Sequence, residues 1–358
     1  MAEQIPDVRL EHVVKRFDDV VAVDGISLEV PAGSFFALLG PSGCGKTTTL
    51  RMLGGFEEPD EGVIELGGRD VVGMPPYKRD VNTVFQSYAL FPHLTVEENI
   101  GFGLRRKGLK GSQLRSRVHE AMLLVAVEQL GKRKPRQLSG GQQQRIALAR
   151  AIVNSPRVLL LDEPLGELDL KLRKQLQLEL KRIQHEVGIT FVHVTHDQEE
   201  AMTMADTIAV MNGGKVDQLG APAELYERPA TPFVAGFLGA SNLLAGELSG
   251  DRVVLADGTS IGVLPNGRSG AVAAGVRPEK IRLGEDGGSN RLTGRVKETA
   301  YVGVATEVIV DTTAGTVSVW TQNSDAGMTP LAPGQTVVLT WSPETTFVVD
   351  RPEETPHD

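Results

Sequence analysis

The first two thirds of the chain alternate between short apolar runs and stretches in which apolar residues recur at helical spacing. Phe35–Leu39, Val158–Leu161 and Thr190–Val194 are short, mainly apolar runs of the length that fits buried strands. Between the last two runs, apolar residues recur at helical spacing; they are Leu172, Leu176, Leu180 and Ile183. Asp169 is placed to cap the start of that helix and Gly188 to end it. Strands that alternate with helices indicate a mostly parallel sheet flanked by helices.

The pattern changes after Phe237, where Gly, Thr and Val become frequent and helical spacing fades. Short runs of β-type composition then recur at Arg252–Leu255, Thr306–Val310, Thr316–Trp320 and Thr336–Thr340. This pattern predicts a small antiparallel barrel or sandwich. A length of 358 residues fits about two domains, and we place them at 1–236 and 237–358.

Composition narrows the class of protein. No apolar run approaches the ~20 residues that span a bilayer, and the N-terminus lacks the pattern of a signal peptide. The single cysteine, Cys44, excludes an internal disulfide framework and fits a reducing compartment. A net charge of -9 argues against nucleic acid as a partner. The basic clusters 105–107 and 132–134 are best interpreted as solvated surface. We therefore expect a soluble cytoplasmic protein.

A glycine-rich loop follows the first apolar run and matches G-x-x-x-x-G-K-[ST] without a mismatch. It consists of Gly40, Pro41, Ser42, Gly43, Cys44, Gly45, Lys46, Thr47 and Thr48. Glycines let the backbone N–H groups point at a β-phosphate, Lys46 adds charge for the β and γ oxygens, and the Thr47 hydroxyl can ligate Mg²⁺. A helix that begins near Lys46 would direct its positive end at the same phosphates. A redox role for the Cys44 thiol is the minor alternative.

Two carboxylates follow the second apolar run. Asp162 ends the run Val158–Leu161 and is the acid that a phosphate-loop site needs for its metal, usually through water. Glu163 comes next and could orient or deprotonate an attacking water. The alternative is a strand with an acidic loop after it, and the glycine-rich loop upstream weakens that interpretation.

A second glycine-bearing helix start lies at Leu138–Gln142, which reads Leu-Ser-Gly-Gly-Gln. Ser139 and Gln142 have the spacing of a capping box, and Gly140 and Gly141 allow close approach. The helix after it has one apolar face, formed by Ile146, Ala149, Ile152 and Val153. A helix N-terminus of this kind predicts a second phosphate-binding site, which suggests a nucleotide shared between two copies of the chain.

With these motifs in place, residues 8–236 resemble an ATP-binding-cassette (ABC) ATPase, and Leu138–Gln142 matches the signature of that family. The resemblance implies an α/β P-loop NTPase fold with a helical subdomain, followed by a small all-β domain of the OB-like, or TOBE, type. It also implies ATP and Mg²⁺ as cofactors. In the family the signature of one subunit closes over the ATP held by another, so the expected state is a head-to-tail homodimer.

Other family positions can be matched one at a time. Gln86 resembles the Q-loop glutamine, which contacts Mg²⁺ and senses the membrane partner, and His196 resembles the switch histidine that contacts the γ-phosphate. Asp169 resembles the aspartate of the D-loop. Phe17 resembles the aromatic that stacks on adenine, and Val23 would pack beside it. The sequence departs from the family at residue 167, where a glutamate stands in place of a small residue. This departure leaves every matched catalytic position intact.

The C-terminal part resembles importer ATPases that carry a TOBE domain, at Glu224–Gly239, Gly275–Glu279 and Tyr301–Glu307. Thr195–Met202 and Phe237–Leu244 look most like the spermidine/putrescine branch. The resemblance implies a peripheral subunit at the cytoplasmic face of the inner membrane. Its partners would be integral-membrane permease subunits and, indirectly, an extracytoplasmic solute-binding protein. The C-terminal domain would serve regulation or dimerisation.

Several alternatives stay open. Sugar and ferric-iron importers share much of these motifs, and the C-terminal domain could itself sense a solute. A soluble ABC ATPase that acts on DNA or the ribosome is less favoured, because only about 90 residues lie between Thr48 and Leu138 and the chain holds one cassette. Tyr88–Thr95, with aromatics that look exposed, resembles the region where importer ATPases receive the membrane subunit. The alternative is that Phe91 and Leu94 pack into the helical subdomain.

Overall fold

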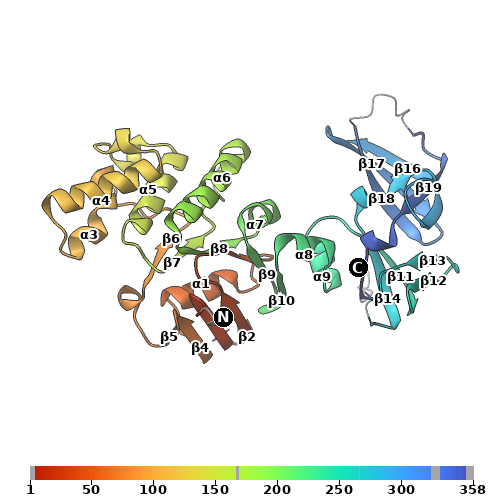
Figure 1. Ribbon diagram of the computed structural model, residues 1–358, viewed down its shortest axis with the longest axis horizontal. Coiled ribbons are helices and arrows are strands. Elements are labelled where there is room, and N and C mark those ends of the chain that lie inside the picture. Colours follow the sequence, from red (N-terminus) through yellow and green to blue (C-terminus); the bar gives the residue numbers. More distant parts are fainter. Residues whose placement is uncertain (1–4, 167–168, 266, 324–330, 352–358) are drawn as a thin grey trace. The chain divides into compact units, whose positions relative to one another are not determined.

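In the computed structural model the chain folds as two units, Met1–Pro222 and Ala223–Asp358. The structure describes residues 5–166, 169–265, 267–323 and 331–351. Two sheets build the first unit, and helices cover the second of them (Figure 1).

The first sheet is antiparallel, in the order β2-β1-β4-β5. Its strands are β1 (Val8–Phe17), β2 (Val20–Val30), β4 (Glu61–Leu66) and β5 (Arg69–Asp70). The predicted alternation of strands and helices does not hold here, because β1 and β2 form a hairpin that turns at 18–19. Side chains of β1 alternate between buried and exposed at Val8, Arg9 and Leu10, as expected when one face of a sheet is covered.

The second sheet has the order β10-β9-β3-β8-β7-β6, and its pairs are parallel except β10 with β9. Its strands are β3 (Phe35–Leu39), β6 (Val81–Val84), β7 (Val158–Asp162), β8 (Thr190–Thr195), β9 (Thr207–Asn212) and β10 (Lys215–Gly220). Every residue of β3 and β8 is buried, because parallel strands are covered on both faces. The mostly parallel sheet predicted from the apolar runs is confirmed.

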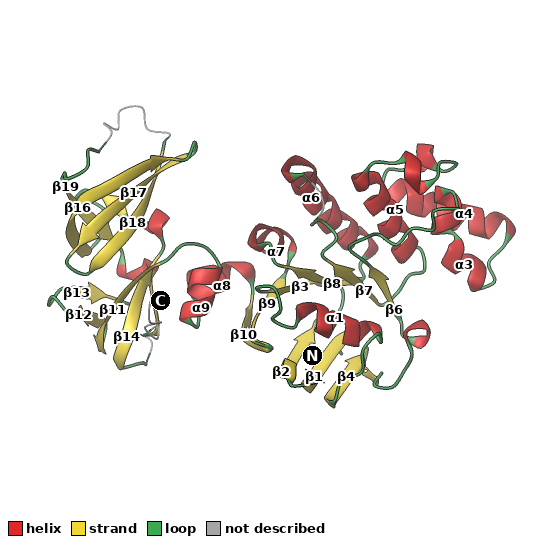
Figure 2. Ribbon diagram, turned by 180° about the vertical axis from the view of Figure 1, so that it is seen from behind, coloured by secondary structure: helices red, strands yellow, loops and turns green. Residues whose placement is uncertain are grey.

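Helix α1 (Lys46–Gly54) lies between the two sheets (Figure 2). Its Leu50, Met52 and Leu53 share one core with apolar side chains of both sheets, such as Leu10 and Val192. The phosphate loop at the start of α1 is therefore held between two sheets.

The remaining helices of this unit cover the second sheet and extend from it. They are α2 (Val96–Ile100), α3 (Phe102–Arg106), α4 (Gly111–Leu124), α5 (Gly140–Ile152), α6 (Leu170–Val187) and α7 (Gln198–Met204), with 3-10 turns η1 (Pro76–Lys78), η2 (Glu128–Leu130) and η3 (Pro135–Gln137). Asp169 caps α6 and Gly188 ends it in the left-handed conformation, which confirms both predicted limits. No helix in the described part of the chain is long and apolar enough to cross a membrane.

The second unit contains two antiparallel five-stranded sheets, β13-β12-β11-β14-β20 and β15-β19-β16-β17-β18. Its strands are β11 (Asn242–Ser249), β12 (Arg252–Leu255), β13 (Ser260–Gly262), β14 (Gly270–Val276), β15 (Arg282–Leu283), β16 (Asn290–Tyr301), β17 (Ala305–Thr312), β18 (Gly315–Gln322), β19 (Thr336–Trp341) and β20 (Thr346–Asp350), with η4 (Pro278–Lys280) and η5 (Pro343–Thr345). Both sheets contribute to one core, which includes Leu244, Val272, Val310 and Trp341. The predicted small all-β domain is confirmed.

Two short helices, α8 (Pro222–Glu227) and α9 (Pro232–Phe237), precede these strands. Arg277, which is 1% exposed, donates to the carbonyl oxygens of Tyr226 and Ala235, each at 2.8 Å. These bonds fasten both helices to the β unit. The chain's contacts therefore divide it at 222, whereas the functional limit between 236 and 237 stays a prediction.

Candidate functional site

The glycine-rich loop connects β3 to α1, and its path depends on residues without a side chain. Gly43 and Gly45 have φ of 79° and 99°, in the region that favours glycine. A Cβ on Gly45 would lie 2.3 Å from the carbonyl oxygen of Ala22, and one on Gly40 would lie 2.3 Å from that of Met211. The loop is therefore pressed against the backbone of both sheets.

Lys46 lies inside this loop. Its side chain is largely buried, since the residue is 5% exposed, and its Nζ donates to the carbonyl oxygens of Gly40 and Pro41, each at 2.8 Å. Gly45 stands at the N-cap of α1, no side chain caps the helix, and its first turn holds no acid. Because a helix N-terminus presents N–H donors and partial positive charge, this end of α1 is suited to bind an anion.

Asp162 ends β7 beside the first turn of α1. Burial raises the pKa of its carboxyl, the neighbouring Glu163 raises it further, and Arg51 together with a hydrogen bond from Thr47 opposes the rise. A divalent cation between Thr47 and Asp162 would offset the cost of holding this carboxylate ionised. Among the described residues no three His, Cys, Asp or Glu side chains form a metal cluster. Mg²⁺ needs none, because it takes one or two carboxylates together with substrate phosphates and water.

Glu163 and His196 follow two neighbouring parallel strands, β7 and β8. Their side chains meet where the strands end, with Glu163 Oε1 lying 3.3 Å from His196 Nδ1. Glu163 adopts a φ of 44°, and its N–H donates to the carbonyl oxygen of Val194 at 3.2 Å. A residue whose backbone adopts this sparsely populated conformation is held there by its surroundings, and such residues cluster at functional sites.

Gln86 follows β6, the strand beside β7, and its side chain is exposed. A Cβ on Gly166 would lie 3.8 Å from Gln86 Nε2 and 3.6 Å from the carbonyl oxygen of Glu163. Gln86 thus lies on the same edge of the sheet as the two carboxylates. The structure brings together the loop, Thr47 and Asp162, with Glu163, His196 and Gln86 near them.

The segment after Gln86 differs from its prediction. Tyr88 is 6% exposed, so the expectation of exposed aromatics is wrong for this residue. Arg150 of α5 holds this segment against the helix, because its guanidinium donates to the carbonyl oxygens of Tyr88 at 2.9 Å and Ala89 at 2.7 Å. Phe91 is half-buried and its ring lies 4.6 Å from that of Phe102.

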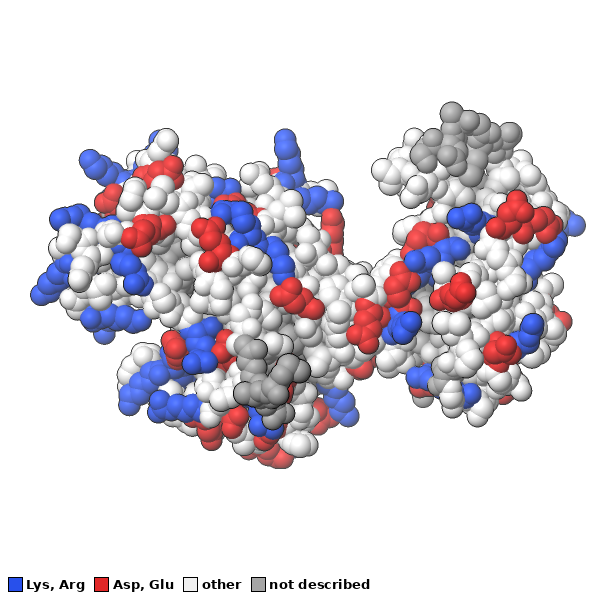
Figure 3. Space-filling model, in the orientation of Figure 1, with Lys and Arg blue, Asp and Glu red and all other residues white. Residues whose placement is uncertain are grey.

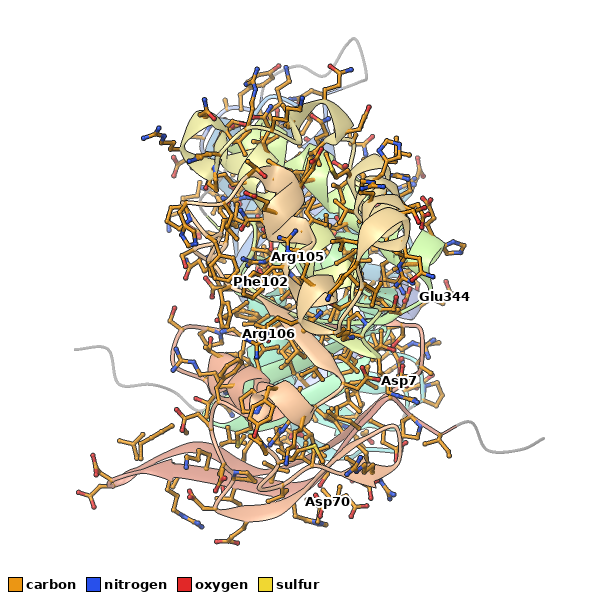
Figure 4. All side chains as sticks on the ribbon, turned by 90° about the vertical axis from the view of Figure 1, so that its left-hand side faces the viewer. Asp7, Asp70, Phe102, Arg105, Arg106 and Glu344 are labelled. Atoms are coloured by element: carbon orange, nitrogen blue, oxygen red, sulfur yellow. The ribbon has the colours of Figure 1, made fainter. Side chains whose placement is uncertain are left out.

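The basic run 105–107 begins on α3, the helix that also carries Phe102. Figure 4 labels Phe102, Arg105 and Arg106. Arg105 donates to the carbonyl oxygen of Glu98, and Lys107 to that of Asn154 at 3.1 Å. Figure 3 shows Lys and Arg gathered over this end of the unit, with acidic side chains among them. These contacts support the interpretation as ordinary surface.

Ser139 to Gln142 lie at the start of α5, one of the helices outside the two sheets, whereas the phosphate loop lies between the sheets (Figure 1). Gln142 N–H donates to Ser139 Oγ at 3.4 Å, and Ser139 N–H donates to Gln142 Oε1 at 3.1 Å. The predicted capping box is confirmed. Gly141 lies against α6, where an added Cβ would be 3.0 Å from Leu172 Cδ2.

Three further matched positions take separate places. Phe17 ends β1 and is 43% exposed, with Lys15 Nζ lying 5.2 Å from its ring centre. Val23 is fully buried and lies beneath the loop, 3.3 Å from where a Cβ of Gly45 would stand. Asp169 Oδ1 accepts from Leu172 N–H at 3.0 Å. Residue 167, the departure from the family, lies outside the described residues.

Sequence reasoning missed the polar groups behind His196. Asp197 caps α7 and Glu200 is buried beneath it. The spacing Asp-x-x-Glu from Asp197 to Glu200 resembles a capping box and could have indicated this helix start.

Comparison with known proteins decides the family. A model described as "ABC transporter" matches residues 23–166, and one described as "TOBE domain" matches 274–349. The spermidine/putrescine import ATP-binding protein of Rubrobacter xylanophilus is 56% identical over 93% of this chain and 91% of its own. The protein with the same description from Thermobifida fusca is 54% identical over 97% and 94%. The chain belongs to the ABC transporter family.

Solved ABC structures agree with the fold of the first unit. The protein cbiO1 of Clostridium perfringens, part of the ABC transporter complex cbiONQ, aligns with a TM-score of 0.57 and 29% identity, over 62% of this chain and 90% of that one. A dimeric ATP-binding cassette in a post-hydrolysis state with ADP and Pi aligns with a TM-score of 0.54 and 32% identity, over 60% and 98%. The predicted fold of an ABC nucleotide-binding domain followed by a TOBE domain is confirmed.

Proposed function

We propose that this chain is the ATP-hydrolysing subunit of an importer that takes up spermidine or putrescine through separate membrane subunits. The observation that carries the proposal is the presence of a phosphate-binding loop in the first unit and a TOBE domain in the second. Relatives that match over most of their length are described as spermidine/putrescine import ATP-binding proteins. Sugar and ferric-iron uptake are the competing cargoes.

The site supports a division of labour among its residues. The loop Gly40–Thr48 and the open end of α1 bind the phosphates, and Lys46 exchanges the carbonyl oxygens that it now contacts for phosphate oxygens. Thr47, Gln86 and Asp162 would hold Mg²⁺, which supplies charge neutralisation at the β and γ oxygens. The exposed face of Phe17 offers a surface for adenine, with Val23 supporting the loop from below.

Hydrolysis then needs a base and an orienting group. Two candidates lie side by side, because Glu163 Oε1 and His196 Nδ1 are 3.3 Å apart where the parallel strands β7 and β8 end. Glu163 accepts a proton from the attacking water, and His196 orients the γ-phosphate. We expect Glu163→Gln to bind ATP normally while turnover falls at least ~10²-fold, as loss of a general base does. Near-normal hydrolysis by this variant would contradict the assignment.

The second copy completes the site. Ser139, Gly140, Gly141 and Gln142 from one chain close over the γ-phosphate held by the other, and Asp169 lies at the junction between the copies. The proposal is supported by the different layers that the two helix starts occupy within one chain and by the dimeric cassette among the solved relatives.

Mixing two inactive variants tests the shared site. Lys46→Ala removes the cation of the phosphate loop, and Ser139→Arg blocks the signature at the start of α5. Neither variant should hydrolyse ATP alone. In a mixed dimer one site keeps an intact loop and an intact signature, and activity should return to a substantial fraction of one wild-type site. Absence of any recovery, with mixed dimers verified by two affinity tags, would show that each chain works alone.

Uptake assays test the cargo. In a strain that lacks this gene, radiolabelled putrescine and spermidine uptake should fall and should return with the wild-type gene but not with Glu163→Gln. Maltose and ferric-iron uptake in the same strain serve as controls. If polyamine uptake in the deletion strain were unchanged while maltose or ferric-iron uptake fell, the cargo would be a sugar or iron instead. The proposed place of the subunit is the cytoplasmic face of the inner membrane, bound to permease subunits.

A further inference from the structure

A buried carboxylate lies behind His196. Glu200, on α7, is 3% exposed. Its Oε2 accepts from Thr195 Oγ1 at 2.8 Å and lies 3.2 Å from His193 Nε2. Because a buried carboxylate is costly unless it is paired, this arrangement holds Thr195, the residue before His196, firmly in place.

The residue after His196 is held as well. Asp197 Oδ1 accepts from the N–H groups of Glu199 at 2.8 Å and Glu200 at 3.3 Å. Its own N–H donates to Thr195 Oγ1 at 2.9 Å. Both neighbours of His196 therefore belong to one hydrogen-bonded network, while the His196 side chain is 59% exposed and faces Glu163.

One cation connects this network to another helix. Arg173 Nη1 donates to Asp197 Oδ2 at 3.0 Å, and Arg173 Nε lies 3.9 Å from Glu200 Oε1. Arg173 belongs to the first turn of α6, and its N–H donates to the carbonyl oxygen of Asp169 at 2.9 Å. The guanidinium thus spans from the start of α6 to both carboxylates behind His196.

We propose that Arg173 is a positioning residue for hydrolysis, which acts through Asp197 to hold His196 toward the γ-phosphate. It also ties the orientation of His196 to the start of α6, where Asp169 would meet the second copy. This inference rests on the proposed function and extends it, because it makes the reaction sensitive to the position of α6 and hence to closure of the dimer.

A neighbouring ion pair supplies a matched control. Lys174 Nζ and Glu199 Oε1 lie 2.7 Å apart and join the same two helices, but both side chains are 54% exposed. Exposed pairs of this kind contribute little. The Arg173 and Asp197 side chains are 24% and 26% exposed, and their partners surround a catalytic residue. Loss of the exposed pair should therefore leave hydrolysis unchanged.

The test measures ATP turnover of the full chain against ATP concentration. We expect Arg173→Met to lower kcat about tenfold, with KM for ATP within about twofold because the loop that binds ATP is untouched. Lys174→Met should keep kcat within about twofold. Arg173→Lys, which retains the charge, should recover part of the loss. Asp197→Asn should resemble Arg173→Met, and the double variant should lose little more than either single one.

Three results would overturn the inference: a normal kcat in Arg173→Met, equal losses in Arg173→Met and Lys174→Met, or additive losses in the double variant. Should Arg173→Met not fold, Arg173→Lys and Asp197→Asn decide by the same criteria. Failure of the proposed function looks different, because it would appear as absent hydrolysis in the wild type or normal hydrolysis in Glu163→Gln.

Discussion

The starts of α1 and α5 both carry glycines and both are proposed to bind ATP phosphates, yet they are built differently. At α1 the N-cap is Gly45, which has no side chain to offer, so the first N–H groups have no capping oxygen. At α5 the N-cap is Ser139, which accepts from Gln142 and forms a complete capping box. One end is open to a ligand in the single chain, and at the other the capping box already pairs the N–H groups of Gln142 and Ser139.

This difference fits the proposal that one chain binds ATP and that a second copy is needed for hydrolysis. An open helix end stabilises an anion without giving up a bond. At α5 the Ser139 Oγ accepts from Gln142 N–H, a bond worth about 1 kcal/mol, while the O–H of Ser139 can still donate to a γ-phosphate. The α5 end can therefore keep its cap when a phosphate held by a second copy meets it.

The largest effect should follow a change at Asp162, the acid that faces the open end of α1. Asp162→Asn should lower turnover by about 10²- to 10³-fold, because metal-assisted charge neutralisation is worth several kcal/mol. Its stability should change in the opposite direction. Since burial raises the pKa of Asp162, the native state loses stability as the pH rises above the ordinary carboxyl value of about 4, and the loss is complete above the raised pKa.

The asparagine variant should therefore melt higher than the wild type at pH 7, and the difference should close as the pH falls to about 4 and below, where the carboxyl is protonated in both states. Calorimetry of the nucleotide-free chain measures it. Glu128→Gln, an exposed carboxylate, controls for the change in net charge. A lower melting temperature in Asp162→Asn would contradict the sign.

A pair of glycine substitutions compares the two helix starts directly. Gly45→Ala places a Cβ 2.3 Å from a backbone oxygen at a φ of 99°, so the loop must move. We expect ATP affinity of the single chain to fall at least ~10²-fold, by analogy with the several kcal/mol that strained positions cost. Gly141→Ala meets only the flexible end of Leu172 at 3.0 Å and should leave ATP affinity unchanged. Fluorescent-nucleotide titration measures both, and similar losses would remove the distinction.

Removal of the Ser139 hydroxyl separates capping from catalysis. Ser139→Ala should cost about 1 kcal/mol of stability and lower turnover about tenfold. Thr95→Ala is matched to it, because Thr95 caps α2 with its own capping box. This control should lose similar stability while turnover of the isolated chain stays normal. Equal turnover in the two variants would show that Ser139 serves only its helix.

Local signals predicted much of this molecule. Phe35–Leu39 is a strand to the residue, and Asp169 and Gly188 bound α6, because apolar runs and caps act within a few residues of sequence. The antiparallel sheet was missed for a physical reason. Its strand β1 mixes buried valines with charged residues such as Arg9, and it pairs with β2 and β4 through registers that shift at bulges. Such pairings are set by distant partners.

The site shows the same division between local and distant causes. The phosphate loop follows from its glycines and Lys46, which lie within one short motif. By contrast, the buried position of Tyr88 depends on Arg150, which lies 62 residues further along the chain. The place of Val23, matched by resemblance to the adenine contact, depends on the approach of Gly45 to β2. No local pattern contains either contact.

The smallest effect should come from Cys44, which lies within the open loop but uses little of its chemistry. Its Sγ is 3.7 Å from Lys46 Nζ, and the residue is 3% exposed, so the thiol fills space beneath the loop and oxidants reach it poorly. Cys44→Ala should keep turnover within about threefold and should remain insensitive to peroxide, as should the wild type. Rapid inactivation of the wild type by peroxide that is absent in Cys44→Ala would contradict this expectation. It would show instead that oxidation of Cys44 controls the phosphate loop, the alternative that the position of this residue in the motif suggested.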